Sequence, residues 1–391
     1  MSAGARRAIL WAAAPPEGVS PSAPLLGLPL ARRVALAAAR AGFDEIHFED
    51  AAGAGAKRHE KEEEGPARVV VLGAGAIPQP GWLKSLLAGS SAANTDETFS
   101  AGDVLPDATA ARAIVVDTNR PDQLLEKLAA GASAAAAGNP AGPAAADAGC
   151  FFLTTSADLP AAETWLLQSL VKENEGFFSR HLHRRISLAL TRRLVTTPIT
   201  PNAMTLISVA IGLAGAGFFL SQKPVFELAG SLLFLAHSIV DGCDGELARL
   251  KFAESRFGGV LDFWGDNVVH CAVFACLAIG WSRSSVDFWP LIAGAAAIAG
   301  TLLAAGFVFR YAMPETREGP QFTSVTQGPQ GRMSRIADAL ARRDFIYLVV
   351  LLSAFGKAHW FLALAAVGAP IFFLVLVGIE TSGRRLERSL S

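Results

Sequence analysis

The sequence predicts two fold classes in one chain: a Rossmann-like α/β domain followed by an all-α domain of six transmembrane helices. Three observations lead to this. The 391 residues are 51% hydrophobic, which is high for a soluble protein. The apolar residues are unevenly spread, because long apolar runs begin only at about residue 204. Before about residue 175, short apolar runs alternate with amphipathic ones. We therefore expect domains at 1–175 and 204–391, joined by an amphipathic segment at 176–203.

The front domain is predicted to contain a parallel sheet, since strand-like and helix-like segments take turns along it. The expected strands are 8–13, 45–48, 68–72, 113–116 and 150–154, and the expected helices are 30–41, 82–87, 121–130 and 161–172. The charged run 57–64 and the Ala/Gly/Pro-rich tract 132–148 are typical of solvated loops. Arg6 and Arg7 before an apolar run are also compatible with a signal peptide, but the run is short and a first strand is the better interpretation.

The segment from Leu25 to Leu36, the stretch 41–46 and the strand and turn at 115–118 resemble a sugar-phosphate nucleotidyltransferase domain. That resemblance implies a glycine-rich turn with a basic residue after the first strand, where backbone N–H groups and a cation hold phosphate. Here the turn reads Ala-Pro-Pro-Glu-Gly-Val at 14–19, with two prolines that lack an N–H group and an acid in place of the base. We expect a degenerate domain. The glycines at 73 and 75 are a weak motif and are interpreted as turn residues.

The net charge is −1, and no basic stripe interleaved with aromatic residues is present, which argues against nucleic acid as a partner. The four cysteines form no C-x2-C pair, so neither zinc nor a disulfide is expected. The histidines at 181, 183, 237 and 270 lack metal-ligand spacing and are expected to pack. Residues 177–193 form a basic amphipathic pattern suited to an anionic membrane surface.

Six membrane spans are expected, at 204–221, 226–248, 258–281, 287–309, 344–356 and 360–380. The fifth is short enough to be a re-entrant or buried helix instead. Arginines and lysines gather in the flank before the first span, in the second and fourth connections and in the tail. The other connections hold only Lys223, Arg283 and Lys357. The bias places both termini at the cytoplasmic face, in an inner membrane.

Four carboxylates stand among these apolar segments and need a chemical reason. Asp241 and Asp244 share a helix face with Ala248, and Asp262 and Asp266 stack at i, i+4 on the next segment. Together they would repel one another, whereas divalent cations would neutralise them and leave positions open for phosphate oxygens. Gly245 and Gly258 would let a ligand or a facing helix come close. Solvated caps at helix ends are the alternative interpretation.

The spacing D-x2-D-G-x2-A-R-x8-G-x3-D-x3-D is met at every fixed position and is identified as the signature of the CDP-alcohol phosphotransferase family. The resemblance implies a transferase that moves a phosphoalcohol from a CDP-alcohol to an acceptor hydroxyl and releases CMP. It implies two divalent ions, Mg²⁺ or Mn²⁺, on Asp241, Asp244, Asp262 and Asp266, with Asp266 as general base. It also implies a homodimer.

The same resemblance assigns donor contacts to Gly245, Ala248, Arg249 and Gly258, and to Asn202 and Thr205 in a P-N-x-x-T element. Asn202 and Thr205 could instead cap the first span. Arg310, Arg342 and Arg343 are candidates for an acceptor phosphate, although positive-inside topology alone would also place arginines there.

A nucleotidyltransferase-like domain ahead of such a membrane domain resembles the bifunctional inositol-1-phosphate cytidylyltransferase and di-myo-inositol phosphate phosphate synthase group. That group implies CDP-inositol as donor and inositol phosphate as acceptor. The alternative enzyme is a phospholipid synthase that uses CDP-diacylglycerol or CDP-archaeol, with membrane lipid as a partner. A scaffold or a cation transporter is the alternative outside the enzyme class.

Overall fold

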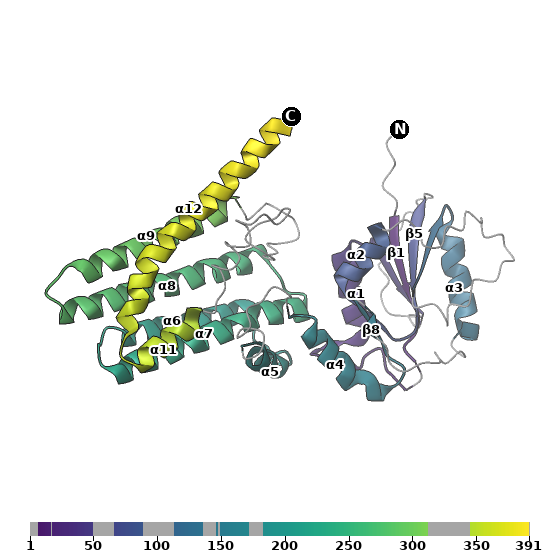
Figure 1. Cartoon of the computed structure of the whole chain (residues 1–391). Coiled ribbons are helices and arrows are strands. Elements are labelled where there is room, and N and C mark those ends of the chain that lie inside the picture. Colours follow the sequence, from purple (N-terminus) through teal and green to yellow (C-terminus); the bar gives the residue numbers. More distant parts are fainter. Residues whose placement is uncertain are drawn as a thin grey trace. The chain divides into compact units, whose positions relative to one another are not determined.

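The computed structural model describes residues 7–16, 18–49, 66–88, 113–135, 146–147, 149–171, 183–311 and 345–390. Two compact units divide the chain, Met1–Ser169 and Leu170–Ser391. Each unit has its own core, and each is described by itself (Figure 1).

The first unit is built on a four-stranded sheet of order β4-β1-β5-β7. Its strands are β1 (Arg7–Ala12), β4 (Glu45–Phe48), β5 (Ala67–Leu72) and β7 (Ala113–Thr118). Strand β1 runs parallel to both of its neighbours, with Ile9 opposite Glu45 on one side and Val69 on the other. Strand β7 is antiparallel to β5 and pairs Val70 with Val115. The prediction of a parallel sheet is therefore wrong at this edge, and the sheet is mixed.

Helices cover both faces of this sheet (Figure 1). On one face lies α3 (Pro121–Ala135), whose Leu124 and Leu128 join a core with Ile9 and Val69. On the other lie α1 (Leu30–Ala41) and α2 (Pro80–Ala88). One face of α1 is buried and includes Val34, Ala37 and Ala38. The helix is capped by Gly42, which takes the left-handed conformation with φ 99°. The alternation of strands and helices in the sequence is thus confirmed as a small α/β unit.

The turn after β1 is held by an acidic side chain of the chain itself. The backbone N–H of Ala14 donates to Glu49 Oε2 at 2.7 Å, and the N–H of Glu49 donates to the carbonyl of Ala12 at 3.1 Å. Buried Arg33 of α1 donates to the carbonyls of Leu25 and Leu26, and its burial lowers its pKa to about 10. A carboxylate of the chain thus accepts a hydrogen bond from a backbone N–H group of this turn.

Smaller elements complete the first unit. They are β2 (Pro24–Leu25), β3 (Leu28–Pro29), β6 (Ala76–Pro78), β8 (Ala146–Asp147), β9 (Cys150–Phe152), the 3-10 turn η1 (Ser156–Asp158) and α4 (Leu159–Gln168). Strands β6, β9 and β8 form a second, antiparallel sheet. Gly75 precedes β6 with φ 72°, and a Cβ there would lie 2.3 Å from the carbonyl oxygen of Leu153. This glycine is a turn residue, as the sequence predicts.

The second unit consists of helices alone among its described residues. They are α5 (Arg184–Leu194), α6 (Pro201–Phe218), α7 (Pro224–Lys251), α8 (Arg256–Ser284), α9 (Trp289–Tyr311), α11 (Phe345–Ala354) and α12 (Ala358–Leu390). Helix α6 packs on α7 and α8, α9 packs on α8 and α12, and both α5 and α11 pack on α7. Phe219, Phe234, Val273 and Leu277 lie in the shared core.

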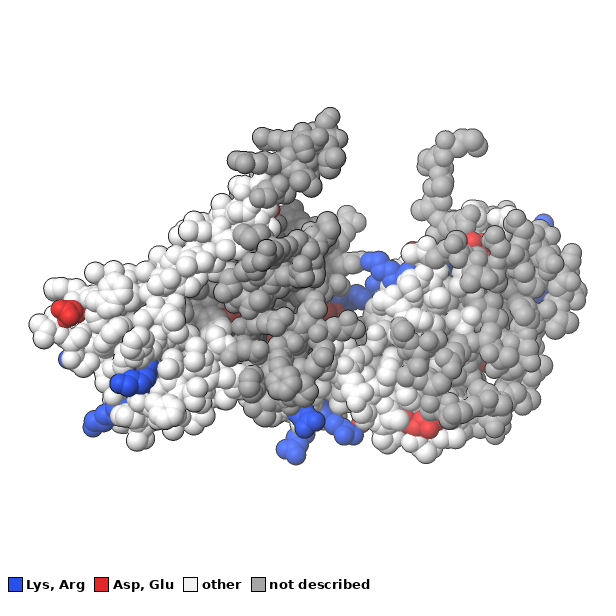
Figure 2. Space-filling model, viewed as in Figure 1, with Lys and Arg blue, Asp and Glu red and all other residues white. Residues whose placement is uncertain are grey.

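Five of these helices are long and apolar enough to cross a membrane: α6, α7, α8, α9 and α12. The segment predicted as the fifth of six spans is the ten-residue helix α11, too short to cross by itself. It ends where Gly356 takes φ 63°, with a hydrogen bond from its N–H to the carbonyl of Ser353. Within the face that Figure 2 presents, the described surface of this unit carries few charged atoms. The second unit is an integral membrane unit.

Candidate active site

Helices α7 and α8 form a hairpin that brings the two halves of the aspartate motif together. Helix α7 ends at Phe252, which takes the left-handed conformation with φ 53°, and the N–H of Ala253 donates to the carbonyl of Ala248 at 2.8 Å. Three residues later Ser255 caps α8 by accepting from the N–H of Gly258 at 3.0 Å. The tight turn places the carboxyl end of one helix beside the amino end of the next.

Three of the four predicted aspartates converge at this hairpin. Asp241 and Asp244 of α7 and Asp262 of α8 each offer a carboxylate oxygen, and these oxygens lie within 4.8 Å of one another. Asp241 and Asp244 are 3% and 7% exposed, so their charges are poorly solvated and repel strongly. An all-oxygen donor set of this kind fits a hard divalent cation such as Mg²⁺ or Mn²⁺. The residues present therefore fit a divalent metal.

Asp266 lies one helical turn further along α8 and is not part of this group of three. Its Oδ1 is 3.4 Å from Nε2 of His237 on α7. The other ring nitrogen of His237, Nδ1, is 2.9 Å from the carbonyl oxygen of Ser208 on α6. The imidazole is buried and bridges α6 to α8. Asp266 is thus held beside the cluster and is less buried than Asp241, with a side chain that is 21% exposed.

Helix α6 contributes the two polar residues of the P-N-x-x-T element. The hydroxyl of Thr205 donates to Asp244. Asn202 lies against α8, because a Cβ built on Gly258 would come 2.9 Å from Asn202 Oδ1. The cap of α6 is Thr200, whose hydroxyl accepts from the N–H of Ala203 at 3.2 Å. Capping therefore does not explain Asn202 and Thr205, and both face the hairpin.

The predicted donor contacts on α7 lie just after Asp241 and Asp244 along the helix. Gly245, Ala248 and Arg249 are all half-buried. The guanidinium of Arg249 folds back over Gly245, since a Cβ there would meet Arg249 Nη1 at 3.4 Å. The charges of Asp244 and Glu246 both act on it. A cation is thus available beside the carboxylate cluster.

The predicted acceptor residues are only partly described. Arg310 lies in the last turn of α9 and is exposed. Arg342 and Arg343 lie outside the described residues. The structure consequently places one of the three candidates at a helix end and says nothing of the other two.

Two residues near the site have roles that the sequence reasoning missed. His237, expected only to pack, faces Asp266; it precedes Asp241 by four residues, and this spacing puts both on one face of α7. Glu246 stands inside the motif, yet its carboxylate faces α5 and is fully buried. The signal in that case is the spacing of Arg184, Ser187 and Thr191, which recur at i, i+3 and i+7.

Comparison with known proteins matches residues 198–372 to the model of the CDP-alcohol phosphatidyltransferase family. A bifunctional IPC transferase and DIPP synthase of Rubrobacter xylanophilus is 34% identical over 149 residues, which cover 38% of this chain and 34% of that protein. A CDP-diacylglycerol–serine O-phosphatidyltransferase of Mycobacterium leprae is 33% identical over 100 residues, covering 23% and 32% respectively. The chain thus spans about a third of the length of these curated relatives.

Among solved structures, a phosphatidylinositol phosphate synthase of Mycobacterium tuberculosis with CDP-DAG bound covers 49% of this chain and 94% of its own. It is 25% identical, with a TM-score of 0.34.

Proposed function

We propose that the chain is a membrane-bound CDP-alcohol phosphotransferase, because residues 198–372 match the model of the CDP-alcohol phosphatidyltransferase family. It transfers a phosphoalcohol from a CDP-alcohol to an acceptor hydroxyl and releases CMP. The observation that carries the proposal is the convergence of Asp241, Asp244 and Asp262, whose carboxylate oxygens lie within 4.8 Å of one another at the α7–α8 hairpin. Such a cluster is suited to a metal-held diphosphate.

Asp241, Asp244, Asp262 and Asp266 hold two divalent ions, Mg²⁺ or Mn²⁺, in this proposal. Ions held by these carboxylates would neutralise charge on the donor's diphosphate and so make CMP a better leaving group. The hydroxyl of Thr205 donates to Asp244 and fixes the orientation of that carboxylate. The protein's part in this step is to hold four carboxylates against their mutual repulsion.

The acceptor hydroxyl attacks the phosphorus that carries the donor's alcohol. A bond forms between the acceptor oxygen and that phosphorus, and the bond from the phosphorus to the oxygen of CMP breaks. Asp266 takes the proton of the hydroxyl as general base. Its partial exposure and its place one turn beyond the cluster suit a group that meets the acceptor rather than the donor.

Donor recognition falls to residues of three helices. Gly245, Ala248 and Arg249 line the hairpin on α7, Asn202 and Thr205 reach it from α6, and Gly258 leaves room on α8. The guanidinium of Arg249 pairs with the donor's phosphate. Arg310, Arg342 and Arg343 are proposed for the phosphate of the acceptor.

For the substrates, we propose CDP-inositol as donor and inositol phosphate as acceptor, in line with the printed name of the relative from Rubrobacter xylanophilus. The second candidate is a phospholipid synthase that uses CDP-diacylglycerol or CDP-archaeol, favoured by the name of the relative from Mycobacterium leprae. In either case we propose that the aspartate cluster lies at the cytoplasmic face of an inner membrane, as the positive-inside bias of the connections indicates. We also propose that both termini lie on this face, with the chain returning between α9 and α12 through α11, and that the protein works as a homodimer.

The first unit is proposed as a degenerate nucleotidyltransferase-like domain with a structural or docking role. Its turn after β1 contains two prolines, which lack an N–H group. The N–H of Ala14 already donates to Glu49. A triphosphate would meet a carboxylate there instead of a cation.

The test is CMP release by the purified full chain in lipid with Mg²⁺ or Mn²⁺. CDP-inositol and CDP-diacylglycerol are each offered with inositol phosphate. Release with CDP-inositol alone supports the first candidate, and release with CDP-diacylglycerol alone supports the second. Asp266→Asn should abolish turnover and keep CDP binding, whereas Asp287→Asn, at an exposed loop position, is the matched control. A transporter or scaffold would release no CMP at all.

A further inference from the structure

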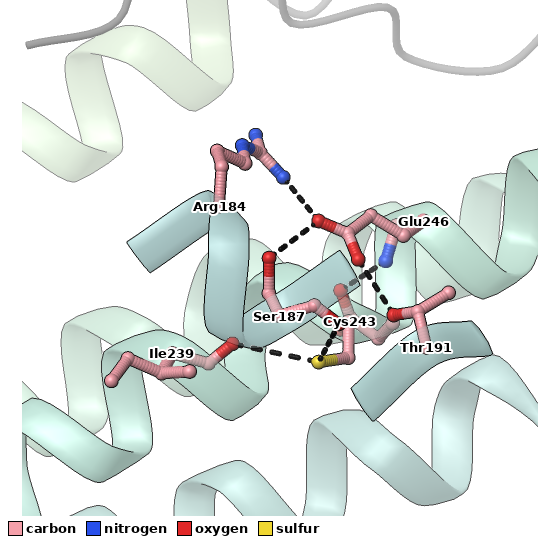
Figure 3. A network of polar contacts seen from close by, with 8 residues as sticks. Arg184, Ser187, Thr191, Ile239, Cys243 and Glu246 are labelled. Carbon is pink, nitrogen blue, oxygen red and sulfur yellow. Dashed lines mark hydrogen bonds and ion pairs between the residues drawn. The ribbon is translucent and has the colours of Figure 1, made fainter. Parts of the chain in front are cut away.

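A fully buried carboxylate lies inside the motif and faces away from the aspartate cluster. Glu246 is 0% exposed. Its Oε1 accepts hydrogen bonds from Arg184 Nη1 at 2.6 Å and from the hydroxyl of Ser187 at 2.7 Å, and its Oε2 accepts from the hydroxyl of Thr191 at 2.6 Å. All three donors come from one face of α5, as Figure 3 shows. Glu246 therefore holds α5 against α7.

The three donors nearly saturate this carboxylate. An ionised carboxylate offers about four acceptor sites, and three are filled here, one of them by a cation. Burial of the charge is tolerated because the ion pair and the hydroxyls compensate for lost water. Cys243 lies on the same side of α7, with its Sγ 3.6 Å from the carbonyl oxygen of Ser187, so the two helices meet closely.

A second guanidinium feels the charge of the same carboxylate. Arg249 follows Glu246 by three residues on α7, a spacing at which side chains of one helix meet. The charges of both Glu246 and Arg184 act on Arg249, the first attracting it and the second repelling it. Glu246 is thus paired with Arg184 and also attracts Arg249, whose guanidinium lies over Gly245.

We propose that Arg184, Ser187 and Thr191 are positioning residues of the donor site: they occupy Glu246 so that Arg249 stays free to bind the donor's phosphate. This inference rests on the proposed function, because it takes Arg249 as a donor contact. Helix α5, which precedes the matched family region, then belongs to the working enzyme. Without Arg184, the buried charge of Glu246 would draw Arg249 toward it and away from the donor.

The competition makes a prediction that simple helix packing does not. Arg184→Ala should raise the KM for the donor about tenfold, with a smaller change in kcat. Adding Glu246→Gln to that variant removes the charge that draws Arg249 away, and should return KM to within about threefold of the original. If α5 served only to stabilise the fold, the second substitution would remove further hydrogen bonds, lower the melting temperature further and leave KM raised.

The experiment measures donor KM, kcat and thermal unfolding for the two variants of the full chain in lipid. Arg185→Ala is the matched control, since Arg185 is the exposed neighbour on the same helix. If Arg184→Ala does not fold, Arg184→Lys keeps the charge but loses the planar guanidinium, and should raise KM about threefold. An unchanged KM in the single variant, or a KM equally raised in the single and double variants, overturns the proposal.

The two proposals fail in different ways. If the unmodified chain releases no CMP from any donor, the proposed function fails. If it releases CMP and the variants behave alike, only the role of α5 fails. Calorimetric measurement of CDP binding in the presence of Mg²⁺ gives the same comparison without turnover. The affinity for CDP should fall in Arg184→Ala and recover in the double variant.

Discussion

The turn after β1 and the α7–α8 hairpin are the two regions of the chain that the sequence resemblances associate with a nucleotide. In the turn, the N–H of Ala14 donates to Glu49, and two prolines offer no N–H group. At the hairpin, three carboxylates converge and Thr205 supports one of them. In our proposal the first region has an acid where a nucleotidyltransferase needs a cation, and the second gathers carboxylates whose charge a divalent ion would balance. The surroundings of a carboxylate thus decide its role, because Glu49 satisfies a backbone N–H group whereas the clustered aspartates fit a divalent cation.

The largest effect on CMP release should come from a substitution in the aspartate cluster. Asp244→Asn removes a ligand charge, and CMP release should fall about a hundredfold or more. Excess EDTA should abolish release, and added Mg²⁺ or Mn²⁺ should restore it. The counterpart in the other region is Glu49→Gln, which should leave release unchanged. Equal losses of CMP release in the two variants would contradict the different roles proposed for the two regions.

The next effect concerns stability in the first unit alone. Ile9 is 0% exposed in β1 and packs with Leu124 and Leu128. Ile9→Ala should lower the free energy of unfolding of this unit by about 2–5 kcal/mol, through lost apolar contacts and the cavity left behind. Chemical denaturation followed by circular dichroism measures the change. CMP release per folded molecule should stay the same, and a parallel loss of release would tie the two units together.

A tenfold effect is expected where α6 meets α8. In Gly258→Ala the new Cβ would lie 2.9 Å from Asn202 Oδ1 and 3.1 Å from Ser255 Oγ, so Asn202 must shift. Donor KM should rise about tenfold, because a small displacement of a positioning group is costly. Gly217→Ala on α6 is the control, since a Cβ there meets nothing within 4 Å. Steady-state kinetics that place the change in kcat alone would contradict a donor contact.

The smallest effect is a pH dependence in the first unit. Hydrogen bonds from the hydroxyl and N–H of Thr154 and from the N–H of Thr155 hold the pKa of Asp158 below its ordinary 3.8. A carboxyl group with a depressed pKa stabilises the fold above its unfolded pKa, and that contribution is lost as the pH falls through the folded pKa. Asp158→Asn should therefore lower the melting temperature at pH 7, and the difference should shrink as the pH falls below 3.8 through the lower pKa of the folded state. Thermal unfolding across this range measures it.

Much of the fold follows from the sequence because periodicity reports which residues are buried. The stripe over residues 30–41 predicts α1, and the apolar runs predict the five long helices. The direction of β7 does not follow, since alternation looks the same in a parallel and an antiparallel strand. The length of α11 does not follow either: hydropathy extends to residue 356, but the backbone at Gly356 turns away.

At the site, helical spacing predicts that Asp241 and Asp244 share a face, and the short turn at Phe252 brings Asp262 to them. Side-chain partners are harder to predict. The contact of His237 with Asp266 depends on how α7 and α8 face each other, which pairwise spacing along one helix does not encode. Glu246 lies within the motif in the sequence, but its side chain contacts α5. Only the tertiary packing shows this contact.

The tight turn between α7 and α8 also affects the order in which the protein can be made. All four aspartates lie between residues 241 and 266, on two helices that are neighbours in the chain. Contacts so close in sequence form early, because little chain entropy is lost in closing them. The carboxylate cluster can therefore assemble while the ribosome is still translating α9 and α12.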